Sequence, residues 1–291
     1  MKVLRIFHRD NKEFEARFCV EAILWQSLNH KNVLPFYGIC ENVFQPLSAM
    51  VSPWMENGDL VGYLKRNNPP ERRSLTLGVA LGLQYLHGLK PPMVHGDLRA
   101  SNVLVDEHRQ PRIADFGLAK VIDAQASSLL PTSFNGRGNT RWQAPELLNA
   151  SRFEGVKPGV TKESDVYAFA HVCWEVFTGS IPFPDLVDGA VILAVAVYDR
   201  RPGRPSEPAT KRGLDDNVWK LMMTCWAAQP RRRLSMNGVV KFLTSGKLIR
   251  RVRVGRAAMQ DSQHILSDWT ESVAGRSLDE LSDGAEEFKL V

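Results

Sequence analysis

The sequence lacks long apolar runs and paired cysteines. No stretch of the 291 residues approaches the roughly 20 apolar residues that a membrane-spanning helix needs. The N-terminus turns from apolar to charged too early for a secretory signal. The four cysteines are far apart and form no CxxC pair: Cys19, Cys40, Cys173 and Cys225. We therefore expect no membrane partner, reduced thiols, and a cytoplasmic or nuclear location.

The sequence also lacks a strong charge of either sign. Lys and Arg number 37 against 32 Asp and Glu, which leaves a net charge of +5 at pH 7. Such a small surplus does not indicate a nucleic-acid partner. The hydrophobic share of 44% and the charged share of 24% are typical of a soluble globular protein. The length fits one large domain or two lobes around a cleft.

The hydrophobic pattern changes along the chain. Residues 1–7 predict a strand and residues 12–28 a helix, while 33–40 and 47–55 predict two short strands, the second ended by a proline. From residue 74 to residue 243 the pattern is mostly helical. The chain should therefore form a small strand-rich lobe followed by a larger helical lobe.

Two stretches place carboxylates at spacings that suit catalysis or metal binding. In "VHGDLRASNVLV", Asp97 stands two residues after His95 and five before Asn102. In "PRIADFGL", a short predicted strand ends at Asp115, and a carboxylate at a strand end before a glycine is well placed to hold Mg²⁺.

Glu21 interrupts the apolar stripe of the first predicted helix. A buried carboxylate is costly unless it meets a cation. Glu21 therefore either lies solvated at the edge of the stripe or pairs with a lysine of the neighbouring strand, for which Lys2 is the candidate.

Taken in order, these motifs resemble the eukaryotic protein kinases. The resemblance is carried by "HGDLRASN" (95–102), "DFG" (115–117) and "APE" (144–146), and by further matches at "KVLRI", "SDVYAFA" and "CWAAQPRRR". "GNTRWQAPE" and "SPWMENGDL" further resemble the tyrosine-kinase-like group. The resemblance covers about residues 1–245.

The resemblance implies an α+β, bilobal protein-kinase-like fold, with a small truncated sheet and one helix in the N-lobe and a mostly helical C-lobe. The kinase domain would span residues 1–246, with the N-lobe at 1–52, the hinge at 53–58 and the C-lobe at 59–246. Residues 247–291, first basic and then acidic, would form a mostly disordered tail.

The resemblance also assigns catalytic roles. Asp97 would accept or orient the proton of the attacking hydroxyl, and Arg99 would place a positive charge near the transferred phosphoryl group. Asn102 and Asp115 would hold the Mg²⁺ that bridges the phosphates of ATP.

Other matched residues would bind the nucleotide. Lys2 would touch the α- and β-phosphates, and Glu21 would fix its position. Leu104 would form the apolar floor under the adenine, and Ser52 would be the small residue that gates the pocket behind it. The edge of the adenine would meet the backbone of three consecutive residues: Pro53, Trp54 and Met55.

A third set of matched residues would be structural. Asp165 would hydrogen-bond the backbone of the catalytic loop, and Glu146 would form a buried ion pair with Arg233 at the end of the activation segment. Three aromatic side chains would stack in the core: His95, Phe116 and Trp25.

Position 96 departs from the family pattern. Gly96 stands where kinases usually carry the arginine that binds a phosphate on the activation loop. We therefore expect activity to be independent of phosphorylation at four candidate positions: Ser127, Ser128, Thr132 and Ser133.

The N-terminal end departs as well, because no G-x-G-x-x-G turn precedes the lysine strand. The nucleotide would lose a set of N–H donors and the sheet would expose an edge. Since Lys2, Glu21, Asp97, Asn102 and Asp115 are all present, we favour truncation of an active kinase. The alternative is a pseudokinase scaffold with weak or no nucleotide binding.

A small-molecule phosphotransferase is a poorer fit, since such enzymes lack the Ala-Pro-Glu segment and its arginine partner. The expected activity is ATP- and Mg²⁺-dependent phosphorylation of protein Ser or Thr in signalling, with Tyr or dual specificity open. The expected partner is a protein substrate. The sequence does not specify an oligomeric state.

Overall fold

The structure is a computed structural model of the whole chain. It describes residues 2–8, 12–40, 47–68, 72–116, 119–121, 140–153, 155 and 159–245, with side chains of the first helix described from Phe18 onward. The chain divides into the units Met1–Leu248 and Ile249–Val291, and only the first contains described residues. The predicted boundary at residue 246 and the predicted tail lie outside them and stay predictions. In the described part, every helix is too short or too polar to span a bilayer.

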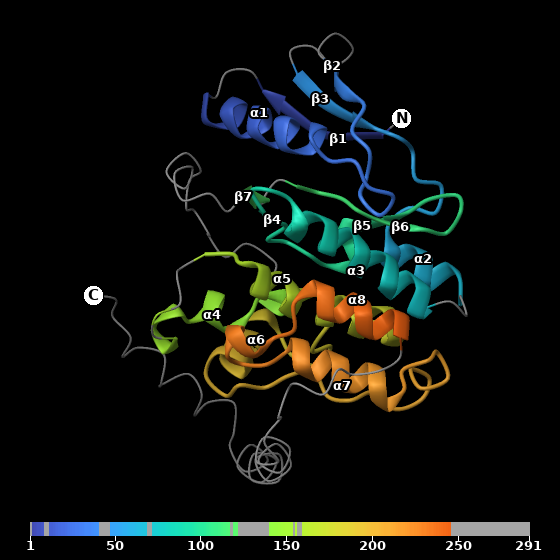
Figure 1. Cartoon of the computed structure of the whole chain (residues 1–291), viewed down its shortest axis with the longest axis vertical. Coiled ribbons are helices and arrows are strands. Elements are labelled where there is room, and N and C mark those ends of the chain that lie inside the picture. The colour runs from blue at the N-terminus through green and yellow to red at the C-terminus, as the bar shows by residue number, and fades with distance from the viewer. Residues whose placement is uncertain are drawn as a thin grey trace, which may run out of the picture. The chain divides into compact units, whose positions relative to one another are not determined.

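The N-terminal part contains a three-stranded antiparallel sheet in the order β1-β3-β2. Its strands are β1 (Lys2–His8), β2 (Gly38–Cys40) and β3 (Leu47–Ser52). Helix α1 (Lys12–Gln26) runs alongside them (Figure 1). Ala22 and Trp25 of α1 are buried. The predicted first strand and first helix are thereby confirmed, and β3 ends just before Pro53 as expected.

The strand predicted over 33–40 is wrong in its first five residues, because only 38–40 form β2. Val33 instead forms an isolated parallel bridge with Ile113, and the N–H of Leu34 donates to the carbonyl of Ile113 at 2.8 Å. The apolar run before β2 thus fastens the N-terminal part to the C-terminal part.

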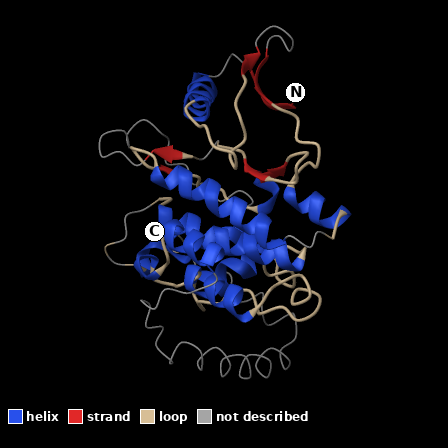
Figure 2. Cartoon of the chain, turned by 45° about the vertical axis from the view of Figure 1, so that its right-hand side comes forward, coloured by secondary structure: helices blue, strands red, loops and turns tan. Residues whose placement is uncertain are grey.

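The C-terminal part is mostly helical (Figure 2). Its helices are α2 (Leu60–Arg66), α3 (Arg72–Gly88), α4 (Pro145–Leu148), α5 (Lys162–Thr178), α6 (Asp188–Ala196), α7 (Asp216–Cys225) and α8 (Met236–Ser245). Two antiparallel strand pairs interrupt the predicted helical run: β4 (Met93–Val94) with β7 (Lys120–Val121), and β5 (Val103–Val105) with β6 (Pro111–Ile113). The α+β bilobal fold is confirmed.

Helix α5 passes through the core of the C-terminal part. All its residues from Ser164 to Phe177 are buried, as expected for a helix that is apolar on nearly all sides. A capping box between Thr161 and Ser164 begins it, and Gly179 ends it in the left-handed conformation with φ of 79°. The helix also carries buried carboxylates, which need partners from other elements.

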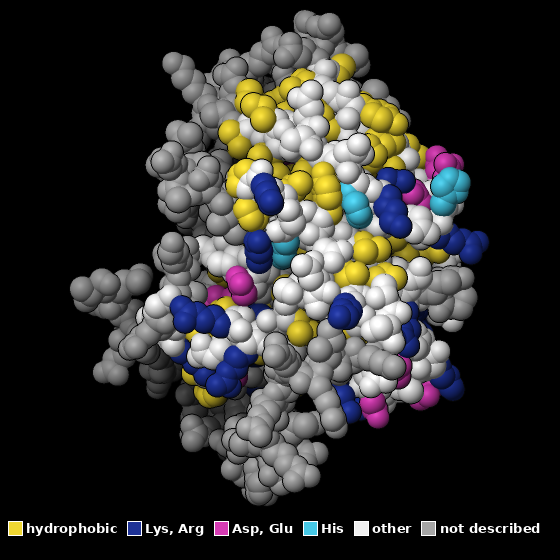
Figure 3. Space-filling model, in the orientation of Figure 1, with side chains coloured by type: hydrophobic (Ala, Val, Ile, Leu, Met, Phe, Trp, Pro, Cys, Tyr) yellow, Lys and Arg dark blue, Asp and Glu magenta, His cyan; other side chains and the backbone are white. Residues whose placement is uncertain are grey.

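Hydrophobic side chains also reach the surface. On the face shown in Figure 3 they gather over the part that holds α1, β2 and β3. Ile23, Tyr37 and Ile39 are among the exposed large hydrophobic residues there. Within the described strands, β1 pairs with β3 alone.

Candidate active site

The catalytic loop runs between β4 and β5 and is held from below by Asp165 of α5. Asp165 Oδ2 accepts from the backbone N–H of His95 at 2.8 Å, and Oδ1 accepts from the N–H of Gly96 at 2.9 Å. His87 Nε2 lies 2.9 Å from Asp165 Oδ2. The predicted role of Asp165 is confirmed, and its carboxylate fixes the two residues that precede Asp97.

Asp97, Asn102 and Arg99 lie together at the end of this loop. Asn102 Nδ2 donates to the carboxylate Oδ2 of Asp97 at 3.0 Å and to its backbone carbonyl at 2.9 Å. Arg99 Nε lies 3.8 Å from Asp97 Oδ2. The hydrogen bond from Asn102 holds the Asp97 carboxylate in place. Because the Asp97 side chain is 13% exposed, it is still reachable from outside.

The surroundings of Asp97 make it a better base than a free aspartate. Burial raises the pKa of the Asp97 carboxyl, and the nearby charge of Asp115 raises it further, whereas Arg99, His95 and the bond from Asn102 lower it. The net effect is an increase. The repulsion between Asp97 and Asp115 also shows that the structure brings these two predicted site residues together.

The residues present fit a magnesium ion. Asp115 follows β6 in the left-handed conformation, with φ of 65°, which turns the chain sharply at the strand end. Because Nδ2 of Asn102 is bonded to Asp97, its amide oxygen is the group left for a cation. One carboxylate and one amide oxygen suit Mg²⁺, which takes its other ligands from water and phosphate. Asn102 and Asp115 could therefore hold the metal, and that assignment stays a prediction.

The aromatic stack behind the loop is confirmed. His95 and Phe116 meet edge to face with ring centroids 5.6 Å apart, and Phe116 lies 6.0 Å from Trp25. His95 Nε2–H donates to the carbonyl of Ala114 at 3.0 Å, which leaves Nδ1 to accept from the N–H of Asp97 at 3.2 Å. His95 is therefore a packing residue with both ring nitrogens satisfied.

The predicted nucleotide-binding residues line the junction of the two parts. Leu104 is buried in β5, and Ser52 is buried at the end of β3, where it is the register partner of Lys2. Glu21 is buried as well, which excludes the solvated alternative. The side chain of Lys2 lies outside the described residues, so its pairing with Glu21 stays a prediction.

The predicted adenine edge follows β3. Pro53 is half-buried and Met55 buried, whereas the Trp54 side chain is 56% exposed. The contact of their backbone with adenine stays a prediction. The four candidate phosphorylation positions lie outside the described residues.

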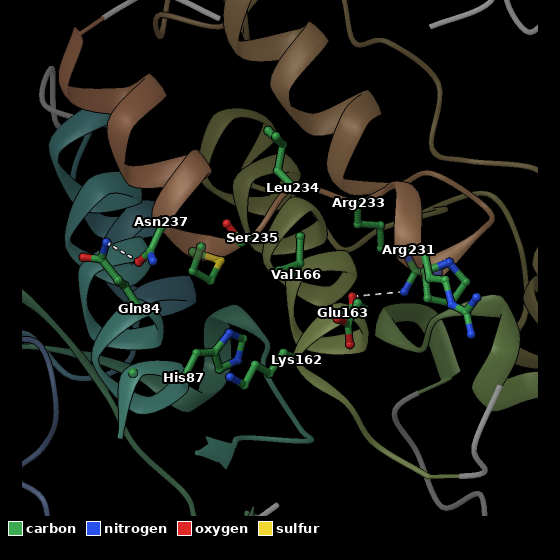
Figure 4. Close-up of a pocket in the computed structure, with 13 residues that line it drawn as sticks. Gln84, His87, Lys162, Glu163, Val166, Arg231, Arg233, Leu234, Ser235 and Asn237 are labelled. Atoms are coloured by element: carbon green, nitrogen blue, oxygen red, sulfur yellow. Dashed lines mark hydrogen bonds between the residues drawn. The ribbon is translucent and has the colours of Figure 1, made fainter. Parts of the chain in front are cut away.

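The ion pair of Glu146 and Arg233 is confirmed. Arg233 Nη1 and Nη2 each lie 2.6 Å from one carboxylate oxygen of Glu146. Arg233 Nη1 also donates to the backbone carbonyl of Glu163 at the start of α5 (Figure 4). Arg233 and His87 both line a cavity of about 200 Å³ among α3, α5 and α8.

Sequence reasoning missed two buried polar contacts in the segment that follows the activation loop. Arg141 donates to the carbonyls of Pro182, Phe183 and Leu186 and pairs with Asp188 at 2.8 Å. Glu175 of α5 accepts from Trp142 and from the catalytic loop. A carboxylate inside the apolar run of α5 was a usable signal, by the same reasoning as for Glu21.

Together, the bilobal fold and the paired Asp97 and Asn102 define a protein-kinase domain. Comparison with known proteins leads to the same family. The profile of the protein tyrosine and serine/threonine kinase family matches residues 1–243. The chain therefore belongs to this family, a family of transferases in which ATP binding is typical.

Several of its relatives are named as serine/threonine kinases, and one is named as a tyrosine-protein kinase. The probable serine/threonine-protein kinase drkC of Dictyostelium discoideum is 30% identical over 84% of this chain and 31% of its own length. Serine/threonine-protein kinase STY17 of Arabidopsis thaliana is 30% identical over 84% of this chain and 39% of its own. Receptor-interacting serine/threonine-protein kinase 3 of Rattus norvegicus is 33% identical over 84% and 52%, respectively. The chain thus spans about a third to a half of these relatives.

Proposed function

We propose that the chain is an ATP- and Mg²⁺-dependent protein kinase that phosphorylates Ser or Thr residues of proteins in the cytoplasm or nucleus, with Tyr or dual specificity open. The observation that carries the proposal is the arrangement of Asp97, its pKa raised, between Asn102 and Arg99. The serine/threonine kinases among its relatives support the choice of hydroxyl.

In this mechanism the chain mainly orients reactants. Asp97 accepts the hydrogen bond of the substrate hydroxyl and takes its proton as this oxygen bonds to the γ-phosphorus of ATP. The bond from that phosphorus to the oxygen shared with the β-phosphate breaks at the same time, and ADP leaves. Arg99 places its positive charge beside the transferred group. Asn102 and Asp115 would hold Mg²⁺, which would neutralise part of the phosphate charge.

The test is phosphoryl transfer by the purified chain with labelled ATP and Mg²⁺ on a library of Ser, Thr and Tyr peptides. We expect incorporation on Ser and Thr peptides that is lost in the Asp97→Asn variant. Equal incorporation by Asp97→Asn would show a contaminating kinase and overturn the proposal.

The second candidate is a scaffold with weak nucleotide binding. Because the 291 residues contain no G-x-G-x-x-G motif, nucleotide binding needs a test of its own. Thermal unfolding with and without millimolar Mg-ATP separates the two: a kinase is stabilised by the nucleotide, and Asp115→Asn weakens the shift. A scaffold shows no shift in either chain.

A further inference from the structure

Glu175 is a buried carboxylate that contacts two loops at once. Its Oε2 accepts from the backbone N–H of Ala100 at 3.0 Å and from the indole Nε1–H of Trp142 at 2.8 Å. Ala100 belongs to the catalytic loop, between Asp97 and Asn102. Trp142 belongs to the last part of the activation segment, just before Ala144-Pro145-Glu146.

The carboxylate therefore depends on both loops. Glu175 is only 4% exposed, and a buried carboxylate is stable only while hydrogen-bond donors reach it. Burial raises its pKa to about 7, while the bonds from Trp142 and Ala100 and the charge of Arg99 act in the opposite direction. If either loop moved away, the carboxylate would lose one of these two hydrogen-bond donors.

Arg99 connects this carboxylate with Asp97. Arg99 interacts electrostatically with Glu175 and lies 3.8 Å from Asp97 through Nε. That Nε is buried and has no hydrogen-bond partner among the described residues. The positive charge of Arg99 thus acts on both carboxylates, Asp97 and Glu175.

Position 96 cannot supply a link between the two loops, because Gly96 has no side chain. We propose that Glu175 is the positioning residue through which the end of the activation segment holds the catalytic loop in its working arrangement. This rests on the proposed kinase activity and adds to it the route by which the segment controls the loop.

Three variants distinguish the hydrogen bonds that Glu175 accepts from the negative charge of its carboxylate. Glu175→Gln keeps an oxygen that can accept from both donors, Glu175→Leu removes it, and Trp142→Phe removes one donor. Glu207→Gln, on an exposed carboxylate that pairs with Lys211, is the matched control. If Glu175→Leu does not fold, Trp142→Phe and Glu175→Gln still decide.

The kinetic result should follow the hydrogen bonds. Displacing catalytic groups by about 1 Å can cost about 100-fold in rate, and we expect about that loss of kcat in Glu175→Leu. Trp142→Phe should lose about tenfold, as for one buried hydrogen bond. Glu175→Gln should stay within about threefold, with KM for ATP little changed throughout. The proposal would be overturned if Glu175→Leu or Trp142→Phe kept the kcat of the wild type. It would also be overturned if Glu175→Gln and Glu175→Leu lost kcat equally.

Hydrogen exchange gives a readout that needs no activity. In Glu175→Leu, or in Trp142→Phe if that variant alone folds, amide exchange should rise at 97–102 and at 140–148 together and stay unchanged in α7 and α8. A rise confined to one loop, or spread over the whole chain, would contradict the coupling. An inactive wild-type chain with the joint rise would refute the proposed function alone.

Discussion

The guanidinium of Arg233 donates two hydrogen bonds of 2.6 Å to the carboxylate of Glu146, and both side chains are almost completely buried. The two residues are 87 positions apart, so the pair joins α4 to the segment before α8. The three remaining guanidinium N–H groups donate to the carbonyls of Glu163, Ala227 and Ala228. A desolvated charge pair of this kind is satisfied only while both partners are present.

Removing one partner of this pair should be more harmful than removing both. We expect Glu146→Gln and Arg233→Met each to lower the free energy of unfolding by about 3–5 kcal/mol, because each leaves a buried charge unpaired. The double variant should cost less than either single change, because it leaves no unpaired buried charge. Urea unfolding measures this, with Arg204→Ala in an exposed pair as the unchanged control. Single losses no larger than that of the control would refute it.

Asp97→Asn should abolish catalysis without unfolding the chain. The asparagine oxygen can still accept from Asn102, but it cannot take a proton, so kcat should fall by about 10²- to 10⁴-fold. Peptide phosphorylation and thermal unfolding measure the two effects. A large loss of stability would show that Asp97 is mainly structural.

The charge of Arg99 should set the acidic limb of the pH–rate profile. Arg99 lowers the pKa of Asp97, and Asp97 must be ionised to accept a proton. In Arg99→Met that pKa rises further, so activity should be lost at a higher pH than in the wild type. Arg99→Lys keeps the charge and should leave the limb nearly in place. An unchanged limb in the Met variant would contradict the assignment.

Activity should not require phosphorylation of the activation loop. Gly96 offers no guanidinium to a phosphate, so a variant with alanine at Ser127, Ser128, Thr132 and Ser133 should keep kcat within about threefold of the wild type. The measurement is peptide phosphorylation by both chains after phosphatase treatment. Abolished activity in the alanine variant would refute the predicted independence from phosphorylation.

Buried His171 should make the fold sensitive to acid. Burial lowers its pKa to about 3, and its neutral Nδ1 accepts from Trp226 Nε1–H at 3.0 Å. Because the pKa is lower in the folded state, the contribution is complete above pH 6.5 and is lost as the pH falls. Between pH 7 and pH 5 the wild type should lose about 2 kcal/mol more than His171→Leu. Parallel urea unfolding series measure this, with exposed His108→Gln as control.

The residues of the catalytic loop could be located from sequence because its geometry is local, and the family resemblance supplied their roles. Asp97, Asn102 and Asp115 lie within a short stretch whose spacing places them on one turn and one strand end. The pairing of Glu146 with Arg233 was also predicted, but only through the family resemblance, since no local pattern joins residues so far apart. The link from Lys2 to Glu21 stays a prediction.

The remaining parts depend on tertiary contacts. Val33 and Leu34 have a strand-like composition, yet they bond to Ile113 from the other part of the chain instead of extending β2. The roles of Glu175 and Arg141 depend on backbone groups of distant loops, whose positions no periodicity reveals. Such contacts appear only once the elements have packed.

Gly96 also lowers the free-energy cost of forming the catalytic loop. It adopts φ of 80° while its N–H is bonded to Asp165, a left-handed conformation that costs other residues roughly 1–2 kcal/mol. An arginine in the same conformation would carry that strain. With glycine, the loop reaches its catalytic shape without that strain. The glycine that offers no side chain to a phosphate thus also lowers the cost of the backbone shape around Asp97.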